Sequence, residues 1–429
     1  MILARIQSRP LRGWAEAMPT WAWVLATASL GFVLLITRQP HTLIDPQLWA
    51  EDGKVWYRDA YLYGPLRPLL APDAGYLNTF QRLVGALGLM LPLALLPLFF
   101  AIVSVVVQVL PITFLATDRM ATVATSRAIR LAVGLGTVVL PNLAELSGDV
   151  TNTQWPLALL ATLVLVSSRT RSNAWRVFDI AVIVASGLSG PFALFLAPEA
   201  ILLAVIRRSR MQMALALLVC MTAAIQGTVL ILSAPHQRAN LLSPAHVDAT
   251  AGAVIVVGRM LLAPLVGASR GAAFAVAIGP WCDLAIATVG MAVIAGAFLW
   301  ASTEVRLLLG FGVLTLAGTL VGSRSLWAAM IRPTAGERYW YIPMLTWLLA
   351  LAVVAARSRF RWARPCALYA LLAVTVVGVP SGWRYPAPAN AHFQEAASRF
   401  AAAAPGRAVT FHEDPPGWQF VLVKAVAGT

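Results

Sequence analysis

Charged side chains are scarce in this sequence, and acidic ones are the scarcer half. Only 12% of the 429 residues are charged, 18 acidic against 32 basic, whereas 59% are hydrophobic. A soluble domain has about a quarter of its residues charged and roughly half apolar. The composition therefore argues against an ordinary water-soluble protein.

Cysteine is rare too, and the common catalytic signatures are missing. The three cysteines lie in or beside apolar segments without paired spacing, which predicts neither a disulfide framework nor a zinc site; they are Cys220, Cys282 and Cys366. The sequence contains no Walker, GxSxG or HExxH motif, so ATP-driven transport and the corresponding hydrolase classes lose support.

Apolar stretches of about 20 residues recur along the chain, which is the length a membrane helix needs. Lipid accepts only helices and closed barrels, and barrel strands would alternate in polarity. The predicted fold class is all-α: a polytopic α-helical membrane protein with about eleven to thirteen transmembrane helices. We expect a transmembrane domain over residues 1–379 with a long external loop at 38–82, and a short extracytoplasmic tail over 380–429.

The positive charges cluster in short loops between the spans. This pattern is typical of cytoplasmic loops in a bacterial-type inner membrane protein, and it explains the net charge of +14 without a nucleic-acid partner. Basic residues before the first span, Thr20 to Thr37, predict a retained signal anchor with the N-terminus in the cytoplasm and the C-terminus outside.

Four features of the segmentation depend on local sequence. A third span is expected over Leu131 to Leu146, and residues 177–206 predict a hairpin broken at Gly187 to Pro191. Residues 252–280 fit either a re-entrant pair or helices at the outer surface. In the long loop, Trp49 to Tyr63 predicts a surface helix with its aromatic residues at the lipid headgroups.

The most informative feature is the acidic pair Glu51-Asp52 in that loop. A carboxylate there can serve as a general base, and two adjacent carboxylates repel, which raises one pKa toward neutrality. We place the base at Asp52 and take Glu51 as the alternate or a tuning partner. Two other interpretations stay open: the pair caps the surface helix at its N-terminus, or it binds a divalent metal ion. No cofactor is certain from the sequence, and no metal ligand set is identified.

Other polar side chains recur at the predicted external ends of several spans, where a single cavity could collect them. Arg82 and Arg338 suit a phosphate, with interfacial anchoring as the alternative. Glu145 would be expensive unpaired in its apolar span. Asn152, Gln154 and Trp155 suit a sugar, with helix capping by Asn152 as the alternative.

Several short motifs resemble those of bacterial multi-spanning proteins related to the GT-C glycosyltransferases. They are Ala50-Glu51-Asp52-Gly53, Ala74-Gly75-Tyr76-Leu77, Gln81-Arg82-Leu83, Asp149-Val150-Thr151-Asn152-Thr153-Gln154-Trp155 and Gly336-Glu337-Arg338-Tyr339. The resemblance implies a polyprenyl-phosphate-linked sugar as donor and an acidic residue of the first external loop, Asp52 or Glu51, as the catalytic group. It also extends the expected substrate contacts to Tyr76 and Tyr339.

The function expected from this resemblance is sugar transfer to an envelope glycan or lipid acceptor on the outer side of the cytoplasmic membrane, with membrane lipids as surroundings. The departing lipid phosphate is a good leaving group and needs no separate acid. The alternatives are a non-catalytic transporter or flippase for a lipid-linked glycan, and a structural partner in envelope assembly. A flippase should place polar groups through the membrane depth, whereas here they gather on one side.

Overall fold

The structure, a computed structural model, describes residues 15–241 and 249–425. Eight helical stretches in these residues are long and apolar enough to cross a membrane, so the chain is a multi-pass α-helical membrane protein. They are α3 (Thr20–Arg38), Leu93–Ala116 including α7 (Leu96–Ala116), Arg210–Ser233 of α12 (Arg210–Leu241), Ala249–Val266, α16 (Pro280–Trp300), α17 (Thr303–Gly322), Glu337–Arg357 including α19 (Tyr341–Arg357), and Ala363–Ser381 including α20 (Ala363–Ala373) and α21 (Val379–Ser381).

Four further helices of the bundle are shorter, which accounts for most of the difference from the eleven to thirteen spans expected. They contain 13 to 16 residues and are α8 (Arg127–Val139), α9 (Gln154–Val166), α10 (Asn173–Gly187) and α11 (Phe192–Arg207). Such helices are about 20–24 Å long, less than the roughly 30 Å of a hydrocarbon core. Every residue of α9 is buried, so this helix forms the centre of the bundle.

The predicted third span is wrong at its C-terminal end. Helix α8 stops at Val139, and Leu140 is already extended, because the residue before a proline, here Pro141, is disfavoured in helical conformation. The expected break between α10 and α11 is present: Gly190 has a φ of +96°, and the neighbouring Ser189 forms a bridge with Asn78.

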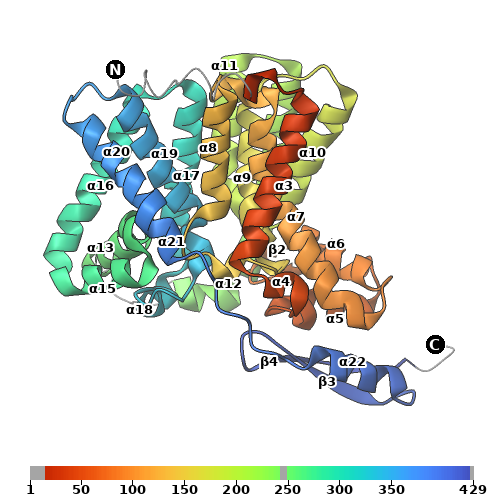
Figure 1. Cartoon of the computed structure of the whole chain (residues 1–429). Coiled ribbons are helices and arrows are strands. Elements are labelled where there is room, and N and C mark those ends of the chain that lie inside the picture. The colour runs from red at the N-terminus through yellow and green to blue at the C-terminus, as the bar shows by residue number, and fades with distance from the viewer. Residues whose placement is uncertain (1–14, 242–248, 426–429) are drawn as a thin grey trace.

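Residues Ala249–Ile278 form a pair of short helical segments between α12 and α16. The first is α13 (Ala249–Ile255) with η7 (Val256–Leu262) and α14 (Ala263–Val266), and the second is α15 (Ala268–Ile278). Figure 1 places α13 and α15 together with α18 (Trp327–Met330), at the end of the bundle away from the N-terminus. Because Ala249–Val266 is itself among the eight stretches long enough to cross a membrane, both expected arrangements stay predictions.

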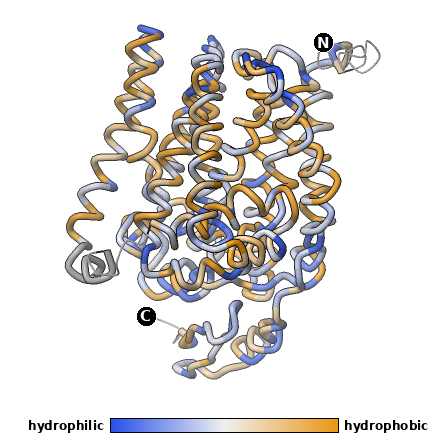
Figure 2. The backbone as a smooth tube through the Cα atoms, turned by 90° about the vertical axis from the view of Figure 1, so that its left-hand side faces the viewer, coloured by the Kyte–Doolittle hydropathy of each residue, from blue (hydrophilic) through white to orange (hydrophobic). Residues whose placement is uncertain are grey.

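The first long loop and the C-terminal segment lie together at one end of the bundle (Figure 1), and Figure 2 shows the C-terminus at the end away from the N-terminus. We call this the tail end, and we call residues 382–425 the tail. The loop contains η1 (Asp52–Tyr57), α5 (Arg58–Tyr63), the strands β1 (Pro72–Asp73) and β2 (Tyr76–Leu77), and α6 (Thr79–Gly88); the tail contains α22 (Phe393–Ala402) and the antiparallel hairpin of β3 (Ala408–Glu413) and β4 (Trp418–Val423).

The loop and the tail share a hydrophobic core. Trp56 and Tyr57 are buried together with Phe400, Phe411 and Phe420 of the tail. The loop helix predicted from the sequence is therefore present, but two of its aromatic residues pack against protein instead of lying at the lipid headgroups. Their burial joins the loop that carries Glu51-Asp52 to a segment more than 330 residues away.

The opposite end of the bundle carries the loop arginines. Arg119 pairs with Asp179 at 2.6 Å, and Arg207 lies 3.4 Å from Glu304 and donates to the carbonyls that end α9. We call it the arginine end. These contacts hold the ends of α7, α9, α11 and α17 together.

Candidate functional site

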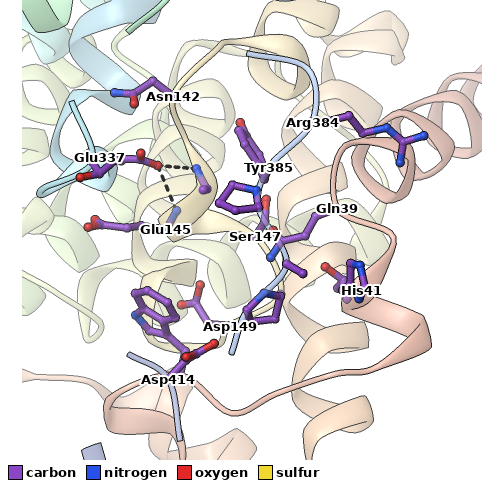
Figure 3. Close-up of a pocket in the computed structure, with 18 of the residues that line it drawn as sticks. Gln39, His41, Asn142, Glu145, Ser147, Asp149, Glu337, Arg384, Tyr385 and Asp414 are labelled. Carbon is purple, nitrogen blue, oxygen red and sulfur yellow. Dashed lines mark hydrogen bonds between the residues drawn. The ribbon is translucent and has the colours of Figure 1, made fainter. Parts of the chain in front are cut away.

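A cavity of about 700 Å³ opens at the tail end, between the bundle and the tail. Four segments form its walls: residues 39–49 of the first loop, residues 142–149 after α8, residues 266–270 between α14 and α15, and tail residues 384–389 with 414–416. Figure 3 shows polar side chains of the first loop, of residues 142–149 and of the tail around this cavity, together with Glu337.

Four carboxylates line the cavity, and two of them hold its floor together. Glu337 accepts hydrogen bonds from the backbone N–H groups of Ala144, at 2.5 Å, and Glu145, at 3.3 Å (Figure 3). Glu145 in turn accepts from the Gly336 N–H at 3.0 Å and pairs with Arg338 at 2.9 Å. The four lining carboxylates are Glu145, Asp149, Glu337 and Asp414. The two glutamates lock segments about 190 residues apart, which is a structural use of charges that would otherwise be costly.

Asp52 lies fully buried beside this floor. One carboxylate oxygen accepts from the N–H and the hydroxyl of Thr151, both at 2.9 Å. The other accepts from the N–H groups of Val150, at 3.3 Å, and Trp49, at 3.4 Å. Burial raises the pKa of Asp52 to about 7, although each of these donors lowers it. Asp52 thus fastens the first loop to the segment that leads into α9.

Asp149 is the next acidic group. Its carboxylate accepts from the Asn152 N–H at 2.7 Å, so it caps the turn that precedes α9. Burial, reinforced by the negative charge of Asp52, raises the pKa of Asp149 well above its ordinary value. Two buried carboxyls that share one region cannot both ionise easily, so the proximity of Asp52 adds to the upward shift in the pKa of Asp149.

Glu51 differs from its neighbour because its side chain is only half-buried. Burial raises the pKa of Glu51, while the charges of Arg338 and Lys54 oppose the shift and that of Asp73 adds to it. Glu51 precedes η1 but makes no side-chain capping bond there. The N–H of Gly53 is satisfied by Glu413 of the tail, at 3.0 Å. The Glu51 side chain therefore makes fewer structural contacts than that of Asp52.

The two predicted phosphate-binding arginines have different surroundings. Arg82 is buried, pairs with Asp59 at 2.9 Å, donates to the Ala71 carbonyl at 2.8 Å and lies over the Trp56 ring at 5.2 Å. These contacts leave it neither at a lipid interface nor facing the cavity. Arg338 keeps 30% of its side chain exposed while bound to Glu145, so it is the arginine with a free face.

The predicted sugar contacts form a buried layer beneath the cavity. Asn152 donates to the Glu145 carbonyl at 2.6 Å, and capping of this turn is done by Asp149 instead. The Trp155 ring makes an edge contact with Tyr339 at 5.5 Å. Next to Tyr339 lies Tyr76, whose hydroxyl is hydrogen-bonded to Gln154; burial, with the neighbouring Tyr339, raises the pKa of Tyr76 to about 12. All these candidates lie together. They support the cavity from beneath and do not line it.

The sequence interpretation missed the tail residues of the site. Arg384, Tyr385 and Asp414 line the cavity, and Glu413 contacts the acidic loop. The available signal was Glu413-Asp414, a second acidic dipeptide in a chain with only 18 acidic residues. Among the residues that the structure describes, no group of three or more His, Cys, Asp or Glu side chains is arranged to hold a metal ion.

Comparison with known proteins gives no relative for this chain. No protein-family model, no curated protein and no solved structure matches it.

Proposed function

We propose that this protein is a membrane glycosyltransferase that moves a sugar from a polyprenyl-phosphate carrier to a cell-envelope acceptor. The observation that supports the proposal most is the cavity at the tail end, where carboxylates from separate segments meet. Glu51, Asp52 and Arg338 do not line it themselves, but Trp49 of the same loop does, and so does Glu145, which pairs with Arg338. Its volume of about 700 Å³ lies within the range of small-molecule sites.

The orientation follows from the positive-inside rule. The arginine end would face the cytoplasm, because short loops rich in Lys and Arg stay on that side. The cavity would then open on the outer side of the cytoplasmic membrane, where polyprenyl-linked sugars meet envelope glycan or lipid acceptors. Membrane lipids would surround the bundle.

The proposed reaction is a single displacement. The acceptor hydroxyl oxygen forms a bond to the anomeric carbon, the bond from that carbon to the phosphate oxygen breaks, and the polyprenyl phosphate leaves with the electron pair. The hydroxyl proton passes to a carboxylate of the first loop. Glu51 suits this step because it is half-buried and has a raised pKa. Asp52 would orient the turn and tune Glu51, and the exposed face of Arg338 would meet the phosphate.

The test is transfer by purified full-length protein in lipid vesicles. Polyprenyl-phosphate hexoses and pentoses, each radiolabelled in the sugar, are supplied with an envelope fraction as acceptor. Glu51→Gln should lower transfer by at least about a hundredfold, the range of a lost general base. Asp52→Asn should lower transfer as well, by displacing the turn that carries Glu51. Glu395→Gln serves as the control, since that tail carboxylate is 70% exposed and pairs only with His392.

Wild-type rates in both loop variants would refute the catalytic role of the pair. Movement of the labelled lipid across the vesicle membrane, without sugar transfer, would support the transporter instead of the enzyme.

A further inference from the structure

The tail holds the backbone directly before the acidic pair. Asp414 pairs with the first loop as a short parallel bridge: its N–H donates to the Leu48 carbonyl at 3.0 Å, and its carbonyl accepts from the Ala50 N–H at 2.5 Å. Ala50 has a φ of +48°, an uncommon conformation for a residue with a side chain. Such a residue persists only where the surroundings fix it, and here the tail is one of the segments that fix it.

The tail also holds the backbone directly after the pair. Glu413 accepts the Gly53 N–H at 3.0 Å. A Cβ on Gly53 would lie 2.3 Å from the Phe420 ring and 2.5 Å from the Glu413 carboxylate, so the glycine allows the hairpin to approach this closely. The adjacent tail residues Glu413 and Asp414 therefore bind the backbone on both sides of Glu51-Asp52.

Further contacts hold the β3–β4 hairpin against the first loop. The Phe411 and Phe420 rings stack at 5.1 Å within the shared core. Lys54 lies over the Trp418 ring at 4.5 Å, and the Tyr61 hydroxyl donates to the Val423 carbonyl at 2.9 Å. The contact thus combines apolar burial with directional bonds, which fixes a position as well as contributing stability.

We infer that the tail is a clamp that sets the geometry of the Glu51-Asp52 turn, with Glu413 as a positioning residue for the reaction. The inference rests on the proposed function. Sub-ångström placement of a reacting group matters because a misplacement of about 1 Å costs on the order of a hundredfold in rate.

The chemistry of Glu413 fits this role better than that of a simple stabiliser. Its side chain is buried, one carboxylate oxygen binds Gly53, and the other has no partner in the described part of the chain. A buried carboxyl with an unpaired oxygen stabilises a fold less than an apolar side chain of similar size. Its specific contribution is the bond to the turn that follows Glu51-Asp52.

The experiment compares Glu413→Ala, which removes the acceptor, with Glu413→Gln, which keeps an amide oxygen for the Gly53 N–H. The control is Glu395→Ala, in the same tail but exposed. Hydrogen exchange of residues 49–57 reports the clamp, and kcat and KM for labelled polyprenyl-phosphate sugar report positioning.

We expect Glu413→Ala to speed exchange at residues 49–57 about tenfold, as for one lost hydrogen bond, and to lower kcat about tenfold to a hundredfold with KM within about twofold. Glu413→Gln should exchange no faster than wild type at residues 49–57 and keep kcat within about threefold of it. If Glu413→Ala does not fold, Tyr61→Phe loosens the same tail from its outer side and should shift both readouts in the same direction.

Unchanged exchange in Glu413→Ala, or equal losses in the alanine and glutamine variants, would overturn the clamp. If the wild-type protein transfers no sugar, the proposed function fails, and the exchange measurement still decides whether the tail holds the turn.

Discussion

The buried carboxyl of Glu413 makes the contact between tail and loop dependent on pH. Burial, together with the negative charges of Asp52 and Glu51, raises the pKa of Glu413 from 4.5 to about 9, and hydrogen bonds from the Gly53 and Lys54 N–H groups oppose the shift. When the tail is docked, Glu413 keeps its proton up to about pH 9. When the tail is released, Glu413 loses this proton above about pH 5. Stability of the docked state must therefore fall as pH rises from about 5 to about 9.

The magnitude follows from the shift. Each pH unit between the two pKa values costs up to about 1.4 kcal/mol, so at pH 7.5 the penalty reaches about 4 kcal/mol as an upper limit. Glu413, with a pKa of about 9, titrates between pH 7 and 9, above Asp52 with its pKa of about 7. Across that window, docking should weaken by up to about 3 kcal/mol.

Glu413→Gln removes this titration and keeps the side-chain size. We expect the variant tail to be docked more stably than wild type at pH 7.5, by about 2 kcal/mol or more, with no loss between pH 7 and 9. The assay is hydrogen exchange of the β3–β4 backbone amides at several pH values, corrected for the intrinsic exchange rate. Equal pH dependence in both proteins, or stability that rises with pH in the wild type, would refute the reasoning.

Three other predictions concern the frame around the site. Arg38→Leu should lower the free energy of unfolding by about 3 kcal/mol in a thermal melt in detergent, because the buried guanidinium donates to the Val138 and Leu140 carbonyls at the end of α8; an unchanged melt would contradict this. Gly85→Ala should lower the melting temperature, since a Cβ there would lie 2.3 Å from a carbonyl oxygen of η1, whereas Gly322→Ala, with open space, should not; equal melts would count against the close packing. A double-mutant cycle of Glu145→Gln and Arg338→Met should give a coupling of about 1 kcal/mol or more, and additive effects would argue against the pair.

Local sequence pattern predicts much of the bundle. The first span is expected at Thr20 to Thr37 and observed as Thr20–Arg38, because a continuous apolar stretch of this length is typical of a membrane helix. The break near Gly190 follows from its glycine and proline residues. The end of α8 was misplaced because the apolar pattern continues past Pro141, while the proline ends the helix.

The site is less predictable, because its contacts join residues far apart in the chain. The hydrogen bonds that Glu145 and Glu337 accept from each other's segments require that residues 144–145, after α8, meet residues 336–337 in the last quarter of the chain. The periodicity of hydrophobic residues does not predict a contact between segments so far apart in the chain. The tail is the stronger case: β3 and β4 are short, and their strand character depends on the aromatic core that they share with the first loop.

Adjacent residues at a helix start point in different directions, about 100° apart in an α-helix, so one of two neighbours can face the protein while the other faces open space. That is the difference between Asp52, fully buried under four donors, and Glu51, half-buried near Arg338. A sequence shows two equivalent carboxylates, and only the fold separates them. The separation gives the two substitutions different signatures: Asp52→Asn should loosen the loop and lower stability together with activity, whereas Glu51→Gln should lower activity in a protein that melts like the wild type. Equal melting in the two variants would mean that the hydrogen bonds of Asp52 do not hold the loop.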